Sequence, residues 1–184
     1  MKCLGLIHLL SGELSVNIHV SKKTMTITKD DIYTWLEEVK DPEIPVLSLV
    51  DLGVITEIEL SESGVKIEMT PTFVGCPALD MMKQEIQEVL TKRGIENISI
   101  EVTFRRPWTS DLISEKGKLA LRKFGLAPPP SREIFTELEV LEHAICPRCD
   151  GTNTELKNAF GPTLCRSIHY CNTCKEAFEQ FKPL

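Results

Sequence analysis

Two cysteine pairs near the C-terminus constrain this chain of 184 residues more than any other feature. The first pair is Cys146 and Cys149, the second is Cys171 and Cys174, and 21 residues separate the two pairs. Each C-x-x-C turn can hold a metal ion with two sulfurs, and two facing turns supply four thiolates in a tetrahedron. The separation slightly exceeds the usual range for zinc ribbons but is close to it. The spacing therefore predicts a small metal-binding unit, with zinc as the expected ion.

The ligand chemistry leaves the identity of this metal open. Four cysteines also suit mononuclear iron or an iron–sulfur cluster, and they leave no open coordination position for a substrate. The chain has an odd number of cysteines, seven, which favours metal binding in a reducing compartment over disulfides. Cys165 and His169 lie between the pairs, and either can replace a ligand. We favour the alternative in which both pack beside the site and support it.

A separate cysteine, Cys76, lies between a strand pattern and a helix pattern. Pro77 suits the first helical position, because the N–H that proline lacks would be unpaired there. We therefore expect Cys76 to cap a helix over residues 77–92, with its sulfur facing free backbone donors and the positive end of the helix dipole. That environment lowers the pKa of a thiol and favours the thiolate, which binds metals. The alternative is a small buried hydrophobic residue at a helix start.

The rest of the pattern predicts a mixed domain of helices and strands before the cysteine pairs. Periodic and alternating apolar residues mark these elements, and a capping box and two glycines mark their ends. The expected order is a helix after the capping box of residues 28–31, a β-hairpin over residues 54–69, a helix over residues 77–92, a strand over residues 98–104 and a helix over residues 111–124.

A run of three prolines separates this domain from the cysteine pairs. Consecutive prolines form a stiff, extended spacer, so we interpret residues 127–131 as part of a linker. The predicted divisions are an N-terminal extension at 1–24, a first domain at 25–127, a linker at 128–133 and a second domain at 134–184. Alternating residues 134–140 predict a strand in the second domain. The extension is either an additional strand-forming segment or an incorrectly assigned start.

Composition and missing motifs exclude several functions. The net charge of −6 argues against a nucleic-acid-binding protein. No apolar run approaches the ~20 residues that a membrane helix needs, and residues 2–10 make only a short imitation of a signal peptide. We therefore expect a cytoplasmic protein. A phosphate-binding glycine loop, a dinucleotide fingerprint and a serine-nucleophile motif are all missing, which favours an accessory protein over a self-sufficient enzyme.

Loop residues outside the cysteines have two interpretations each. Asp41, Glu43 and Asp51 can serve as metal ligands or acids, but in isolation turn and capping roles explain them better. Trp108, between Pro107 and a threonine, either contacts a partner protein or belongs to the core.

Several segments together resemble one protein family. They are Asp41–Ser48, Asp51–Ile55, Thr70–Ala78, Pro107–Asp111 and the tail that includes Phe160–Cys165 and Cys171–Lys182. These motifs resemble the PaaD family, also called PaaJ, of the phenylacetyl-CoA epoxidase (phenylacetate-CoA oxygenase) system. Its first domain is similar to the SufT-like iron–sulfur cluster assembly domain. The resemblance covers roughly residues 28–184. It departs from the family at Arg106, where proline is expected, and does not include the extension.

The resemblance implies an α+β fold, in which a two-layer domain precedes a small β zinc ribbon. It implies a maturation factor for the metal-dependent oxygenase of aerobic phenylacetate degradation, with the oxygenase and reductase subunits as partners. Cys76 would then take up and pass on iron or an iron–sulfur cluster, and Asp41 and Glu43 would be neighbours of that site. Dimerisation would bring two Cys76 thiolates together, but no sequence feature requires it.

Two alternatives to the maturation factor remain open. One is a non-catalytic structural subunit of the oxygenase complex, in which the Pro107–Trp108 loop and the ribbon are docking surfaces and Cys76 is packed. The other, ranked last because residues 143–184 are only weakly basic, is a regulator that binds nucleic acid through the ribbon.

Overall fold

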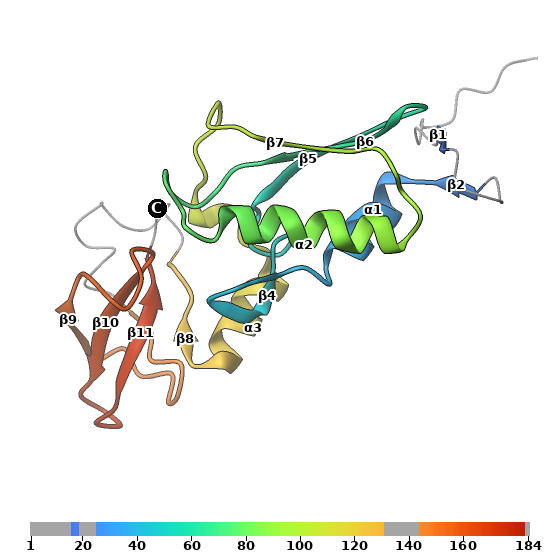
Figure 1. Ribbon diagram of the computed structural model, residues 1–184. Coiled ribbons are helices and arrows are strands. Elements are labelled where there is room, and N and C mark those ends of the chain that lie inside the picture. Colours follow the sequence, from blue (N-terminus) through green and yellow to red (C-terminus); the bar gives the residue numbers. More distant parts are fainter. Residues whose placement is uncertain (1–15, 19–24, 131–143, 183–184) are drawn as a thin grey trace, which may run out of the picture.

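The computed structural model describes residues 16–18, 25–130 and 144–182 (Figure 1). It confirms the predicted α+β class, because helices pack on a mixed sheet and a separate small sheet carries the cysteine pairs. The strand predicted over residues 134–140 and most of the extension at 1–24 lie outside the described residues. The predicted domain boundaries stay predictions.

A three-stranded mixed sheet forms one layer of the first domain. Strands β5 (Ile55–Ser61) and β6 (Gly64–Met69) make the predicted antiparallel hairpin, and β7 (Ile98–Val102) pairs parallel to β6. The hairpin turn requires glycine at position 64, where φ is +145° and a Cβ would lie 2.2 Å from the carbonyl oxygen of Asn97. The parallel pairing requires a crossover, which a helix between β6 and β7 provides.

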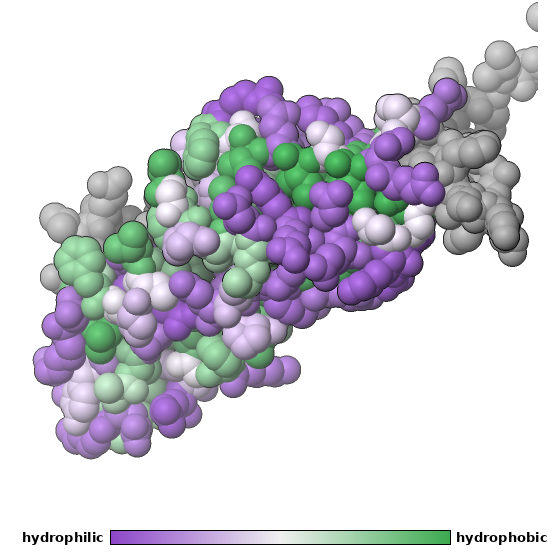
Figure 2. All heavy atoms as spheres, in the orientation of Figure 1, coloured by the Kyte–Doolittle hydropathy of each residue, from purple (hydrophilic) through white to green (hydrophobic). Residues whose placement is uncertain are grey.

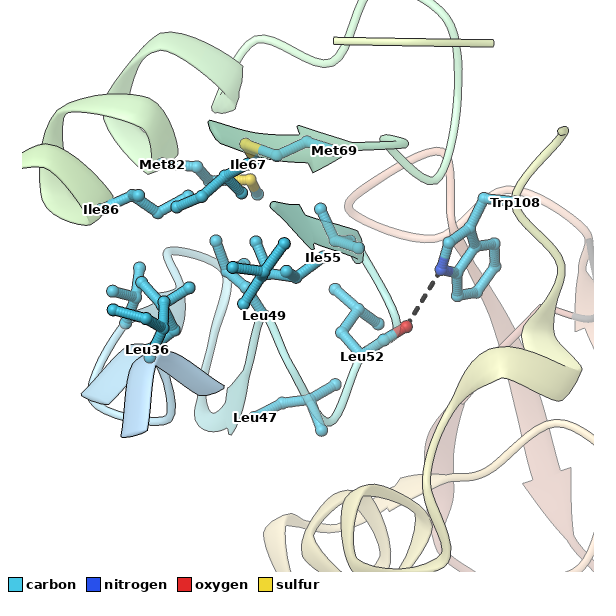
Figure 3. Packing of buried hydrophobic residues seen from close by; sticks show 14 of the residues in the cluster. Leu36, Leu47, Leu49, Leu52, Ile55, Ile67, Met69, Met82, Ile86 and Trp108 are labelled. Atoms are coloured by element: carbon cyan, nitrogen blue, oxygen red, sulfur yellow. Dashed lines mark hydrogen bonds between the residues drawn. The ribbon is translucent and has the colours of Figure 1, made fainter. Parts of the chain in front are cut away.

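Helices α1 (Lys29–Leu36) and α2 (Leu79–Lys92) form the second layer, along one face of this sheet (Figure 1). The predicted capping box starts α1, because the Thr28 hydroxyl accepts from the backbone of Asp31 and the Asp31 carboxylate accepts in return. Apolar side chains from both layers meet in one core (Figure 3). Figure 2 shows hydrophobic surface between α2 and the sheet, and hydrophilic side chains over the outer face of α2.

Two elements start later than predicted. The helix expected from residue 77 begins at Leu79 with Ala78 as its N-cap. The helix expected over residues 111–124 is a 3₁₀ turn, η1 (Ser110–Leu112), followed by α3 (Glu115–Phe124). Extended backbone separates the two, because the Ser114 hydroxyl caps the first turn of α3.

Short hairpins surround this core. Strands β3 (Lys40–Asp41) and β4 (Ile44–Ser48) pair around the Asp-Pro-Glu loop, and α3 packs against β4. Strands β1 (Val16–Ile18) and β2 (Met25–Ile27) form an antiparallel pair beside α1 (Figure 1). In the described ranges, no helix is both long and apolar enough to cross a bilayer.

The cysteine pairs lie in a second sheet that is joined to the first domain. Strands β9 (Thr154–Asn158), β10 (Arg166–Cys171) and β11 (Ala177–Phe181) are antiparallel. We call the unit of residues 144–182 the ribbon. Strand β8 (Leu126–Ala127), at the end of α3, pairs parallel to β11 and is the fourth strand of the sheet. The ribbon therefore shares a sheet with the chain that precedes the linker.

Trp108 belongs to the core, which decides between its two interpretations. Its side chain is 5% exposed, and its indole N–H donates to the carbonyl oxygen of Leu52 over 3.0 Å (Figure 3). Its ring packs on Phe181 of the ribbon, with 5.8 Å between ring centroids. Trp108 thus links a loop of the first domain to strand β11.

Asp51 also has a structural role. Its carboxylate accepts from the hydroxyls of Ser48, over 2.8 Å, and Ser114, over 2.7 Å, and lies 3.3 Å from the ammonium of Lys116. Burial alone would raise the pKa of Asp51, but these hydrogen bonds and the neighbouring cation outweigh burial and lower the pKa. The carboxylate therefore fixes the loop before β5 to the start of α3.

We expect Asp51→Asn to lower the free energy of unfolding by about 1–3 kcal/mol near neutral pH, since the charged acceptor is lost. The folded-state pKa lies below the ordinary value of 3.8, so the stabilisation is complete above that value and disappears as pH falls through the folded pKa. Denaturant titrations across this range should show the two proteins converging in acid. Asp111→Asn, at an exposed position, is the control. A difference that is constant with pH would contradict this role.

Candidate metal centre and thiol site

The four paired cysteines converge on one point of the ribbon. Their sulfurs all lie within 4.8 Å of one another. The Cys146 and Cys174 sulfurs are 3.7 Å apart, and the Cys149 and Cys171 sulfurs are 3.6 Å apart. A disulfide requires about 2.05 Å, whereas four sulfurs at about 2.3 Å from a central zinc ion are about 3.8 Å apart. The geometry fits the predicted zinc site and contradicts disulfides.

The local fold explains this convergence. Cys146 and Cys149 occupy the turn before β9, while Cys171 ends β10 and Cys174 lies in the turn before β11. Backbone hydrogen bonding, above all from Cys174, lowers the pKa of the Cys171 thiol to about 6. The ribbon therefore presents one thiolate near neutral pH around which a cation can collect the other three sulfurs.

His169 and Cys165 are not in this four-sulfur group. The His169 ring stacks on Phe178 and pairs with the Ser167 hydroxyl over 3.0 Å, so it packs beside the site as we favoured. Cys165 lies in the turn before β10 and belongs to the apolar core of the first domain. The possibility that Cys165 is a fifth candidate ligand of the ribbon metal finds no geometric support.

Cys76 lies in the loop between β6 and α2, partly buried. It is two residues before the N-cap, but its sulfur still accepts backbone hydrogen bonds from Ala78 and Leu79 at the start of the helix. The predicted low pKa is wrong. Burial, together with the carboxylates of Asp41 and Glu43, raises the pKa of the Cys76 thiol despite these two hydrogen bonds. Without metal, the neutral thiol is therefore the favoured form.

Asp41 and Glu43 lie on the opposite wall of the same cavity. One oxygen of the Asp41 carboxylate accepts from the backbone N–H of Glu43 and of Ile44, each over 2.9 Å. This is the predicted turn role. Burial nevertheless raises the pKa of Asp41. The turn holds both acidic side chains beside Cys76, so the turn role and a role at the site coexist.

The cavity beside Cys76 has a volume of about 20 Å³. Asp41, Glu43 and Cys76 line it from the first domain, and Cys165 and Phe181 line it from the ribbon. Sequence reasoning considered Cys165 only in relation to the ribbon metal, because its only visible context was the two flanking cysteine pairs. Nothing in the local pattern reports how the ribbon docks, so the sequence carried no signal for this position.

Comparisons with known proteins agree with this architecture. Residues 130–182 match the family described as the PaaD zinc beta ribbon domain, and residues 29–102 match the family described as iron–sulfur cluster assembly protein. An Escherichia coli (strain K12) protein is 33% identical over 152 residues, which is 83% of this chain and 91% of that protein. The chain belongs to the PaaD family. By name only, this PaaD relative is one of the subunits of a 1,2-phenylacetyl-CoA epoxidase.

The first domain of this PaaD family member has its own relatives. An Fe-S protein maturation auxiliary factor of Porphyromonas gingivalis is 36% identical over 96 residues, which cover 51% of this chain and 90% of that factor. The crystal structure of a domain of unknown function, DUF59, from Bacillus anthracis is 29% identical and covers 50% of this chain and 90% of that one, with a TM-score of 0.48.

Proposed function

We propose that this protein is a maturation factor that supplies iron to a multicomponent oxygenase of the phenylacetyl-CoA epoxidase type. Cys76 is the residue that takes up and passes on the metal. The observation that carries the proposal is the position of the Cys76 thiol, partly exposed at the cavity that Asp41 and Glu43 share. The names of the relatives, an epoxidase subunit and an Fe-S protein maturation factor, support both parts of this function.

The two sulfur sites of the protein suit different tasks. The four ribbon sulfurs surround a zinc ion completely, which leaves no position for a receiving ligand. At Cys76 one soft thiolate and two hard carboxylates offer an incomplete and mixed ligand set. An incomplete set binds more weakly and leaves positions that a ligand of the receiving protein can occupy. The Cys76 site is therefore the one suited to transfer.

The neighbouring carboxylates favour a cation at this site. They raise the pKa of the Cys76 thiol, so a metal ion must displace a proton when it binds. The same negative field attracts a divalent cation and compensates its charge. The oxygenase and reductase subunits are the proposed partners, and the cytoplasmic location stays a prediction.

Iron transfer from Cys76→Ser tests this function. We expect the zinc-loaded variant to fold normally and to deliver iron(II) to metal-free oxygenase components at least tenfold more slowly than wild type, because the soft ligand is lost. The measurement is anaerobic iron transfer followed by elemental analysis of the recipient. Ser63→Ala, in the exposed turn between β5 and β6, is the control. Equal delivery by Cys76→Ser and wild type would refute the proposal.

The structural-subunit alternative loses one of its surfaces. It used the Pro107–Trp108 loop for docking, but Trp108 is buried against Leu52 and Phe181. A fixed stoichiometry with the oxygenase that persists in Cys76→Ser, together with unchanged oxygenase activity, would favour this alternative.

A further inference from the structure

The ribbon contributes a second thiol to the Cys76 cavity. Cys165 is 6% exposed and packs with the apolar core of the first domain rather than with the residues around the ribbon metal. It lines the cavity with Cys76, Asp41 and Glu43. Asp41 and Glu43 influence both thiols, since their charges raise the pKa of each. Two soft and two hard ligand groups therefore face one small space.

Specific contacts hold Cys165 in this place. Its backbone carbonyl accepts from the N–H of Lys182 over 2.8 Å, and its sulfur lies 3.1 Å from the Thr163 hydroxyl. The next residue, Arg166, donates from its guanidinium to the carbonyl oxygen of Glu43 over 2.8 Å and to the Glu179 carboxylate over 3.0 Å. The turn that carries Cys165 is therefore anchored both to the ribbon and to the acidic loop opposite.

The cavity size limits what can bind. Its volume of about 20 Å³ exceeds the roughly 10–15 Å³ that one water molecule needs. A single metal ion fits in this space. An iron–sulfur cluster has at least four atoms and would require the ribbon to move away. The cavity therefore favours a mononuclear cation over a preassembled cluster.

We infer that Cys165 is a second ligand at the Cys76 site, so that the two domains together form one site for a single thiophilic divalent cation such as iron(II). This inference rests on the proposed function and specifies its cargo. Binding breaks two S–H bonds, forms two metal–sulfur bonds and releases two protons to solvent or to the carboxylates. No atom changes its oxidation state, so no oxidant or reductant is needed.

The site is looser than the ribbon centre. Among the described residues, the four ribbon sulfurs are the only group of three or more such donor atoms within 4.8 Å of one another. The donors at the cavity must therefore draw together when the cation binds. Because the ribbon supplies one of them, any movement of the ribbon relative to the first domain opens the site. This arrangement would couple metal release to docking on a recipient protein.

Iron-edge X-ray absorption of the wild-type protein tests the inference without a mutation. The ribbon is first loaded with zinc, and one equivalent of iron(II) is then added under anaerobic conditions. We expect two sulfur neighbours around the bound iron. One sulfur neighbour would overturn the composite site while leaving Cys76 as the transfer residue. Failure to bind iron would overturn both the inference and the proposed function.

Two variants provide the second measurement. Cys165→Ala should weaken iron(II) binding at least tenfold in an anaerobic competition titration, with the zinc content unchanged. Met82→Leu is the matched control, because it removes a thioether sulfur from the wall of the same cavity at nearly constant volume. We expect Met82→Leu to bind iron as the wild type does. Wild-type affinity in Cys165→Ala, with weak binding in Cys76→Ser, would refute the two-thiol site and retain the proposed function.

Discussion

Cys171→Ser is expected to unfold the ribbon while the helices of the first domain remain. The buried cluster inside the ribbon contains only Ala127, Ala144, Cys146, Cys171 and Phe178, and two of these five residues are ligands of the metal site. So small a core does not offset the conformational entropy of the ribbon. Structural zinc in comparable modules contributes about 10–16 kcal/mol near neutral pH. Loss of the metal therefore removes most of the stabilisation of the ribbon.

Zinc release and hydrogen exchange measure this effect. In wild type, a strong chelator should expose the amides of β9, β10 and β11 to exchange, and re-addition of zinc should protect them. The amides of α1 and α2 should change much less. Cys165→Ala is the control, since its sulfur is not in the four-sulfur group and the variant should keep its zinc. Persistent protection of the ribbon strands after complete zinc removal would contradict a metal-dependent fold.

Trp108→Ala is expected to lower the free energy of unfolding by about 3–5 kcal/mol. The substitution opens a large cavity under the loop, leaves the buried carbonyl of Leu52 without its indole donor and removes the ring that packs on Phe181. Because Phe181 also lines the Cys76 cavity, the variant should loosen the contact between ribbon and first domain as well.

Denaturant titration of zinc-loaded protein is the appropriate measurement, with two comparisons. Trp108→Phe keeps an aromatic ring but loses the hydrogen bond, so we expect a smaller loss of about 1–3 kcal/mol. Leu119→Ala, at an exposed position of α3, should change stability by less than about 0.5 kcal/mol. A similarly small effect of Trp108→Ala would show that the ring faces solvent, as the partner-contact interpretation required.

The secondary structure was largely predictable because it follows from local rules. Alternating residues place β5 and β6, the Thr28–Asp31 capping box starts α1, and Gly125 ends α3 in a left-handed conformation. The error at α2 has a local cause as well. Pro77 is compatible with a helix, but the two residues after Cys76 remain in a turn, and the helix begins only after Ala78.

The two sulfur sites differ in how far sequence predicts them. The four ribbon ligands were predictable, because each C-x-x-C turn fixes two sulfurs locally. The pKa of Cys76 was not, because the carboxylates that raise it belong to the β3–β4 loop, about 35 residues earlier in the chain. Helix-end donors alone pointed in the opposite direction.

By itself, the sequence determined the metal-binding pattern of the ribbon, the order of helices and strands, and the identity of Cys76, Asp41 and Glu43 as candidate residues. Only the tertiary structure decided that Trp108 is core and that Cys165 faces Cys76 instead of the ribbon metal. The physical reason is range. Turns and sulfur pairs are set by neighbours along the chain, whereas the pairing of β8 with β11 and the bond from Arg166 to the Glu43 carbonyl join segments far apart in sequence.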